Sequence, residues 1–289
     1  MSDKTIRREA FAKINLGLDV VRRLPNGYHE VRMIMQTVGI CDVLTFRKAE
    51  SGIQLIVDKE ELPSDQNNLI YKAAKLLMDT AGISDTKGVC ITLEKHIPIA
   101  AGMAGGSTDA AAALLGINEL YEIGYDVDKL KELGVKIGAD VPYCIQGGTA
   151  LAEGIGEVLS ELPTPPACHL VIAKPDINVS TKFVYENLRA NELESHPDID
   201  GMIEGLEKGD LKAITDRLAN VLETVTVPAY PIIDEIKQSM LDAGAEGALM
   251  SGSGPTVFGI FTELEKAKQA AKRIKDAELA KQVFVTAFC

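Results

Sequence analysis

The stretch from Pro98 to Leu115 constrains the fold more than any other part of this sequence. It begins with small residues and glycines, Pro-Ile-Ala-Ala-Gly-Met-Ala-Gly-Gly-Ser-Thr, and continues as Asp-Ala-Ala-Ala-Ala-Leu-Leu. An apolar segment over 89–93 precedes it and favours a strand. The order therefore predicts a strand, then a tight loop, then a helix that runs to about Tyr121.

This loop has the features of an anion-binding site. Its three glycines let backbone N–H groups turn toward an anion, and the helix adds its positive N-terminal end. Ser107 or Thr108 is the expected N-cap, with Asp109 in the first turn. The loop lacks the lysine of GxxxxGK[ST] and does not match GxGxxG. We expect a phosphate cradle; the alternative is a tight turn whose glycines serve packing only.

The rest of the pattern predicts an α+β protein in two domains. Alternating apolar residues predict strands over 5–21, 31–46 and 53–57, and apolar positions three and four apart predict a helix over 68–81. From His169 onward the order is close to the β-α-β-β-α-β arrangement of ferredoxin-like domains. Its predicted elements are a strand at 169–173, helices from about 181 and over 199–206, 211–222 and 232–243, strands at 248–250 and 256–261, a helix at 263–276 and a strand at 283–288. We place the boundary near residue 158, which gives domains 1–158 and 159–289.

Four short segments admit both a structural and a functional interpretation. Gly138-Ala139-Asp140-Val141-Pro142 holds a carboxylate that either shapes its turn or is catalytic. Residues 250–256 suit a plain hairpin turn or a close backbone approach to a ligand. Lys13 is an edge residue extending to solvent or is directed at a carboxylate or phosphate. Gly27-Tyr28-His29 is an aromatic turn or a clamp for a ring.

Charge and cysteine content narrow the classes of partner. The chain has 30 basic and 42 acidic residues, and a net charge of −12 disfavours nonspecific binding to nucleic acids and anionic membranes. No apolar run approaches the roughly 20 residues that cross a bilayer, and no signal peptide is visible. The five scattered cysteines predict neither a disulfide framework nor a structural zinc site. We therefore expect a cytoplasmic protein with small-molecule partners and leave its oligomeric state open.

Three segments resemble, in order, the three motifs of the GHMP kinases, the family of galactokinase, homoserine kinase, mevalonate kinase and phosphomevalonate kinase. They are Ala12-Lys13-Ile14-Asn15-Leu16, the Pro98–Thr108 loop and Ser251-Gly252-Ser253-Gly254. The motifs have the right order and separations across nearly the whole chain. The resemblance implies the two-domain GHMP kinase fold, with an N-terminal α/β domain, a C-terminal ferredoxin-like domain, and the use of ATP and Mg²⁺.

Two further segments, Gly27–Glu30 and Gly138–Pro142, narrow the resemblance to one branch of that family. This branch phosphorylates the tertiary 2-hydroxyl of a cytidine-diphosphate-linked methylerythritol on the non-mevalonate route to isoprenoid precursors. The resemblance thus implies an enzyme, a phosphotransferase with an alcohol acceptor, that yields ADP and a 2-phosphate. It implies that Lys13 and Asp140 are the catalytic residues and leaves the ligands of Mg²⁺ unassigned.

The resemblance also implies binding residues for both substrates. Those matched to ATP form the glycine loop and an adenine pocket near it: Asn68, Leu69, Lys95, Pro98, Ile99, Ala100, Ala101, Gly102, Met103, Ala104, Gly105, Gly106, Ser107 and Thr108. Those matched to the cytidylated acceptor form a polar contact, an aromatic clamp around cytosine and part of the third motif: Asn15, Tyr28, His29, Thr181, Tyr185, Gly252, Ser253 and Gly254.

The sequence departs from the family pattern around the loop. Ala100, Ala101 and Ala104 stand where some relatives carry Gly or Ser, and Asp109 follows the loop where others have Asn. A carboxylate beside a triphosphate would be repelled unless it points away or helps to hold Mg²⁺.

Two other functions stay open. One is another small-molecule GHMP kinase, of homoserine or mevalonate type, which needs no aromatic pair around a base. The other is a catalytically silent nucleotide-binding protein, which tolerates loss of the two catalytic residues.

Overall fold

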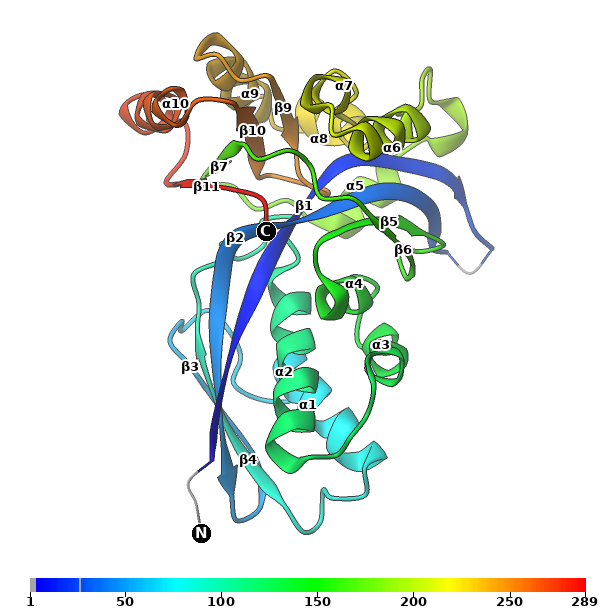
Figure 1. Ribbon diagram of the computed structural model, residues 1–289, viewed down its shortest axis with the longest axis vertical. Coiled ribbons are helices and arrows are strands. Elements are labelled where there is room, and N and C mark those ends of the chain that lie inside the picture. Colours follow the sequence, from blue (N-terminus) through cyan, green and yellow to red (C-terminus); the bar gives the residue numbers. More distant parts are fainter. Residues whose placement is uncertain (1–3, 26) are drawn as a thin grey trace. The chain divides into compact units, whose positions relative to one another are not determined.

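The computed structural model describes residues 4–25 and 27–289 (Figure 1). These residues pack into two compact units that interleave along the chain. The first unit takes the chain up to Ala12, then Ile40–Ile97 and Ala104–Gly147, and the second takes Lys13–Gly39, Pro98–Met103 and Gly148–Cys289. The two units are defined by packing and each combines separate stretches of the chain. They therefore do not test the predicted domain boundary near residue 158, which stays a prediction.

In the first unit a small set of strands is combined with helices. Strand β4 (Gly88–Glu94) pairs parallel with β3 (Gly52–Val57) and antiparallel with the last part of β2 (His29–Ala49), from Val43↔Glu94 to Ala49↔Gly88. Strand β1 (Thr5–Arg23) begins in this unit and continues into the second. The helices are α1 (Leu69–Thr80), α2 (Gly105–Tyr121), α3 (Val127–Val135) and α4 (Val141–Gln146).

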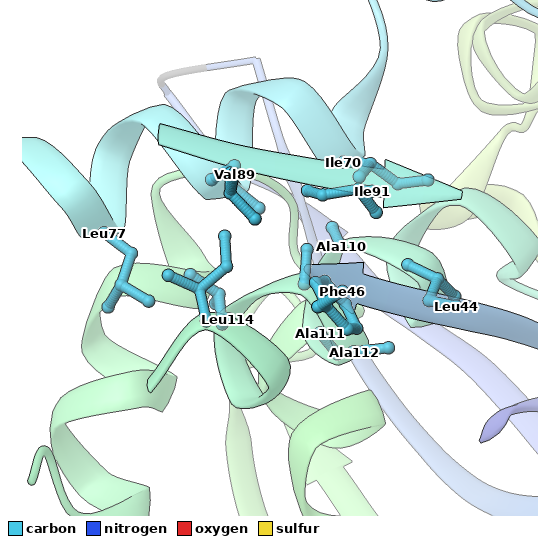
Figure 2. Close-up of a cluster of buried hydrophobic side chains, with 14 of the residues drawn as sticks. Leu44, Phe46, Ile70, Leu77, Val89, Ile91, Ala110, Ala111, Ala112 and Leu114 are labelled. Carbon is cyan, nitrogen blue, oxygen red and sulfur yellow. The ribbon is translucent and has the colours of Figure 1, made fainter. Parts of the chain in front are cut away.

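The core of the first unit lies between β2, β4 and the helices α1 and α2. Figure 2 shows Phe46 of β2 and Leu114 of α2 among the buried side chains that fill it. The alanine run 110–113 is fully or almost fully buried, so α2 presents little side-chain bulk. A Cβ on Gly116 would lie 2.4 Å from Phe46 Cε2, so only glycine allows this close approach. The helix that follows the loop is therefore fixed in the core.

The second unit contains strands of two sheets. One set has the order β6-β5-β2-β1-β8 and belongs to the same seven-stranded sheet as β3 and β4; its new strands are β5 (Thr149–Glu153), β6 (Val158–Leu162) and the two-residue β8 (Ala219–Asn220). Strand β5 pairs antiparallel with β2 over Met33–Gln36, and β8 pairs parallel with β1. The other sheet has the order β11-β7-β10-β9, with β7 (His169–Lys174), β9 (Gly247–Met250), β10 (Val257–Phe261) and β11 (Gln282–Thr286).

The β11-β7-β10-β9 sheet confirms the predicted ferredoxin-like order, because its register pairs are all antiparallel and its central strands are the first and third of the series. The helices of this unit occur close to their predicted places, apart from the segment after Leu211. They are α5 (Thr181–Asn187), the 3₁₀ turn Ala190–Glu192, α6 (Ile199–Lys208), α7 (Leu211–Thr215), α8 (Glu223–Ala229), α9 (Ile232–Asp242) and α10 (Leu264–Asp276).

The predicted helix over 211–222 is wrong. Helix α7 stops at Thr215, and Ala219 and Asn220 instead pair with Gly17 and Leu18 of β1. The apolar spacing of the segment is helical, but pairing with a strand distant in sequence overrides local preference here. The short elements α3, α4, α8, β5 and β6 were not predicted at all.

Candidate active site

Helix α2 begins without a side-chain cap. Its N-cap is Ala104, which has φ 56° and ψ 26° and no side-chain group that could accept a hydrogen bond. The prediction that Ser107 or Thr108 caps this helix is wrong, because helical geometry starts earlier, at Gly105. Thr108 lies inside the first turn, where its N–H donates to Ala104 O at 2.9 Å and its hydroxyl to Phe11 O at 2.8 Å. An uncapped helix N-terminus offers backbone donors and partial positive charge to an anion.

Two of the three residues expected to form an adenine pocket, Leu69 and Lys95, lie close to this end of the loop within the first unit. A Cβ on Gly105 would lie 3.1 Å from Lys95 Nζ, and one on Gly106 would lie 3.4 Å from Leu69 Cδ1. Asn68 caps α1 by accepting from Ile70 N–H at 2.9 Å, and its amide donates to Pro63 O at 2.7 Å. The structure thus brings Leu69 and Lys95 against the two glycines, and their role toward adenine stays a prediction.

Lys95 belongs to a buried cluster of charges. Its ammonium donates to Asp42 Oδ2 and, at 2.7 Å, to Asp109 Oδ2. Asp42 Oδ1 also accepts the backbone N–H groups of His96 and Ile97 at 2.6 and 2.8 Å. All three charged side chains are at most 5% exposed. The carboxylate of Asp109 is therefore held by Lys95 in the interior of this unit.

The balance of charge in this cluster depends on Asp109. Burial raises the pKa of Asp109 to about 8, with Lys95 opposing the rise and Asp42 adding to it. Asp109 Oδ1 is buried and has no hydrogen-bond partner. A protonated Asp109 leaves one cation facing one anion, which is the arrangement that low-dielectric surroundings favour.

Asp140 is at the N-cap position of α4 but does not act as a cap. Its side chain makes no capping hydrogen bond to the helix, and the residue is half-buried. The turn that carries it lies beside the start of α2, because a Cβ on Gly138 would be 3.9 Å from Ser107 Oγ. The structural interpretation of Asp140 as a capping carboxylate is therefore not supported, and within the first unit its turn adjoins the end of the loop.

Lys13 is in the second unit, within β1, and it is only 5% exposed. Its ammonium donates to Asn15 Oδ1 at 2.8 Å, and Asn15 Nδ2 donates to Met33 Sδ at 3.3 Å. Its backbone N–H donates to Met103 O at 3.2 Å, which ties β1 to the first part of the loop. Lys13 is thus no solvent-directed edge residue, and its action together with Asp140 stays a prediction.

The third motif lies against the first part of the glycine loop. Ser251 Oγ donates to Gly102 O at 3.0 Å, and a Cβ on Gly102 would lie 2.3 Å from Ser251 O. Gly102 and Gly252 have φ of 70° and 56°, and Ala100 has φ 52°. The segment is also the connection between the antiparallel strands β9 and β10, as a hairpin turn would be, and its approach to a ligand stays a prediction.

The aromatic residues expected around cytosine meet in part. The rings of His29 and Tyr185 are 5.1 Å apart at 42°, and Thr181, one turn before Tyr185 on α5, exchanges a 2.8 Å hydrogen bond with Ser253. Burial, aided by the charge of Arg23, lowers the pKa of His29, so the ring is neutral at pH 7. Tyr28 is 58% exposed. The second unit therefore groups His29, Thr181, Tyr185 and Ser253, and a role toward cytosine stays a prediction.

Sequence reasoning missed some of the residues that hold these loops. Asn220, Thr226 and Asp42 belong to no motif, and a carboxylate within a largely apolar strand is the one signal that could have pointed to Asp42. In the part of the chain that the structure describes, no group of three or more His, Cys, Asp or Glu is placed to hold a metal ion. Within residues 4–25 and 27–289, none of the five cysteines forms a disulfide and no helix is long and apolar enough to span a membrane.

Comparison with known proteins agrees with this arrangement. Residues 68–148 match the family model of the GHMP kinases N terminal domain, and residues 202–280 match that of the GHMP kinases C terminal domain. The 4-diphosphocytidyl-2-C-methyl-D-erythritol kinase of Lachnoclostridium phytofermentans is 52% identical over 284 residues, which cover 98% of this chain and 97% of the relative. The enzyme of the same name from Lachnospira eligens is 51% identical, with 98% of each chain covered.

Solved structures show the same relationship. A crystal structure of 4-(cytidine 5'-diphospho)-2C-methyl-D-erythritol kinase superimposes with a TM-score of 0.83 at 33% identity, covering 98% of this chain and 99% of the other. A homoserine kinase from Cytophaga hutchinsonii, at 23% identity and a TM-score of 0.80, shares the fold. The predicted two-domain GHMP kinase fold is thereby confirmed. The chain belongs to the GHMP kinase family and, within it, to the family of the 4-diphosphocytidyl-2-C-methyl-D-erythritol kinases.

Proposed function

We propose that this protein transfers the γ-phosphoryl group of ATP to the 2-hydroxyl of 4-diphosphocytidyl-2-C-methyl-D-erythritol. The products are ADP and the 2-phosphate, a step toward isopentenyl diphosphate. The acceptor is taken from the relatives that are about half identical over the whole chain. One observation of the structure supports the chemistry: the turn that includes Asp140 adjoins the start of α2, which has no side-chain cap and attracts phosphate.

The proposed roles of Asp140 and Lys13 follow from the nature of phosphoryl transfer. The transition state is loose, so the protein mainly positions the reactants and stabilises charge. The acceptor oxygen bonds to the γ-phosphorus while the bond from that phosphorus to the bridging oxygen of ADP breaks. Asp140 orients the hydroxyl and takes its proton late in the step. Lys13, held by Asn15, offsets the negative charge that develops.

The proposed ATP site consists of the loop Pro98–Thr108 and the residues near its second part. Backbone N–H groups from Gly102 to Ser107 and the helix N-terminus would face the phosphates, whereas the N–H of Thr108 already donates to Ala104 O. Asn68, Leu69 and Lys95 would lie near the adenine. We propose that ATP acts as its Mg²⁺ complex, since Mg²⁺ in kinases is held by substrate phosphates with one or two carboxylates and needs no cage of protein ligands.

The proposed acceptor site lies in the second unit. Tyr28, His29 and Tyr185 would flank the cytosine, with Asn15, Thr181 and the segment Gly252–Gly254 near the rest of the acceptor. Stacking adds about 0.5–1.5 kcal/mol beyond area burial. The neutral His29 ring can donate one hydrogen bond and accept another at the base edge, which gives discrimination between bases. We also propose that the protein acts in the cytoplasm.

The direct test combines the protein with ATP, Mg²⁺ and the cytidylated methylerythritol and measures ADP and the phosphorylated product. Asp140→Asn should lower kcat by about 10²–10⁴-fold with little change in the KM for ATP, because only positioning and proton transfer are lost. Asp126→Asn is the matched control, since Asp126 caps α3 in the same unit through Lys129 N–H. Near-normal turnover by Asp140→Asn would refute the catalytic role.

The acceptor site is tested separately by His29→Ala. The KM for the cytidylated acceptor should rise far more than the KM for ATP, and CMP should compete with the acceptor in the wild type. His196→Ala serves as the control because His196 pairs with Asp19 elsewhere in the second unit. A kinase of homoserine or mevalonate type would show no competition by CMP, and equal changes in both KM values would argue against a clamp.

A further inference from the structure

Asn220 joins a strand to a loop far away in the sequence. It is the second residue of β8, and its backbone lies opposite Leu18 of β1. The next residue, Val221, donates its N–H to Leu18 O at 3.0 Å. Asn220 is therefore anchored to the same strand that carries Lys13 and Asn15, within one compact unit.

The side-chain amide of Asn220 uses both of its ends. Its Nδ2 donates to Met250 O at 2.9 Å and to Gly252 O at 2.8 Å, and its Oδ1 accepts from Leu222 N–H at 3.0 Å. The residue is 6% exposed. Because carbonyl oxygens only accept, the NH₂ group has to face the loop. Of the side chains of this size, only asparagine supplies two donors toward the loop and one acceptor on the other side.

The loop held by Asn220 touches two parts of the proposed active site. On one side Ser251 Oγ donates to Gly102 O at 3.0 Å, within the loop proposed for the phosphates of ATP. On the other side Ser253 Oγ exchanges a 2.8 Å hydrogen bond with Thr181, at the start of the helix that carries Tyr185. Thr226 adds a contact of 3.3 Å to Ser253 O. The side-chain amide of Asn220 thus holds a loop that makes one hydrogen bond to each of these two parts of the proposed site.

We propose that Asn220 is a positioning residue for both substrates, acting on ATP through Ser251 and Gly102 and on the acceptor through Ser253 and Thr181. The assignment of the two substrates rests on the proposed function. Asn220 touches neither substrate; it holds the loop between them. Loss of its two donors frees the loop and shifts both contacts together, and small displacements of positioning groups have large kinetic effects.

The sharpest test is Asn220→Asp, which keeps the size and shape but turns the donor end into an acceptor facing two carbonyl oxygens. We expect the KM for ATP and the KM for the acceptor each to rise roughly tenfold or more at a temperature where the variant is folded by circular dichroism. Ser251→Ala should raise mainly the KM for ATP, and Thr181→Val mainly the KM for the acceptor. Together the three variants separate the loop's contact with the ATP site from its contact with the acceptor site.

The matched control is Asn118→Asp in the first unit. Asn118 holds the turn at Tyr125 with one donor at 2.9 Å and one acceptor at 3.1 Å, so the same chemical change is made away from the loop. This control should lower the melting temperature and leave both KM values within about twofold of the wild type. If Asn220→Asp changes stability but neither KM value, or changes only one of them, the proposal is overturned.

A second variant and a second measurement keep the test decisive. If Asn220→Asp does not fold, Asn220→Ser removes a donor without adding a charge, and its KM values are judged by the same criteria. The equilibrium Kd of ATP, measured without acceptor, separates this inference from the proposed function. A wild type that binds ATP but does not phosphorylate the cytidylated acceptor would refute the function. Unchanged ATP binding in Asn220→Asp would instead refute the positioning role.

Discussion

The two units hold the parts of the proposed site in chemically different ways. In the first unit, the start of α2 is tied down by charges, with Lys95 between Asp42 and Asp109. In the second unit, the third motif is tied down by neutral groups, chiefly Asn220 and Ser251. A buried charge needs its partner and the right protonation state, whereas a neutral amide needs only donors that face acceptors. The first arrangement should therefore depend on pH and the second should not.

The largest expected effect comes from breaking the charged cluster at Asp42. Asp42→Asn should reduce the free energy of unfolding by about 3–5 kcal/mol, because the buried ammonium of Lys95 loses its main anionic partner. Asp109→Asn should not reduce it at pH 7, since Asp109 is largely protonated there and a neutral asparagine avoids the free-energy cost of taking up that proton. Urea denaturation of both variants measures the difference. Equal losses of unfolding free energy in the two variants would mean that Asp109 is ionised and that both carboxylates stabilise the Lys95 ammonium alike.

The contact between the third motif and the glycine loop in the second unit is tested by adding a methyl group to a glycine. Gly102→Ala places a Cβ 2.3 Å from Ser251 O at φ 70°, whereas Gly148→Ala has φ 73° and nothing within 4 Å. Both variants carry the strain of left-handed alanine, about 1–2 kcal/mol. Gly102→Ala should lose a further 1–3 kcal/mol or so from overpacking and should also raise the KM for ATP. If the two variants unfold at the same denaturant concentration, the loops are not in tight contact.

A change of pH tests the difference in pH dependence between the two units. Asp109 takes up its proton near pH 4 in the unfolded chain and near pH 8 when folded, so between these values the folded state binds more protons. Stability from this group is complete below about pH 4 and is lost as the pH rises through about 8. The melting temperature of wild type relative to Asp109→Asn should therefore fall from pH 5 to pH 8.5. Parallel curves would contradict the raised pKa.

Much of the fold could be predicted because its main elements have strong local patterns. The long strands β1 and β2 show apolar alternation, α2 is a run of helix formers after a glycine-rich loop, and the ferredoxin-like series has the expected order of strands and helices. The region 211–222 could not be predicted, because Ala219 and Asn220 form a strand only through pairing with β1, about 200 residues earlier in the chain. Short elements such as α4 and β5 span too few residues to show a period.

The candidate site divides in the same way. Motifs identified the loop, Lys13 and Asp140, because glycines and isolated charges stand out in a sequence. The residues that hold those motifs could not be recognised, since Asn220 and Thr226 are ordinary polar residues whose partners lie 27 to 32 positions away. The first turn of α2 was also misjudged. Ala104 starts the helix in a left-handed conformation, which no propensity favours for alanine.

That start of α2 has a consequence for how ligand binding would be observed. Serine, threonine, asparagine and aspartate are the preferred side chains for closing the first turn of a helix, but none of these closes the first turn of α2. A phosphate group bound at this end would complete the secondary structure itself. Phosphate binding and the ordering of the first turn of α2 would then occur together. The rate of amide hydrogen exchange from Gly105 to Thr108 therefore reports on both.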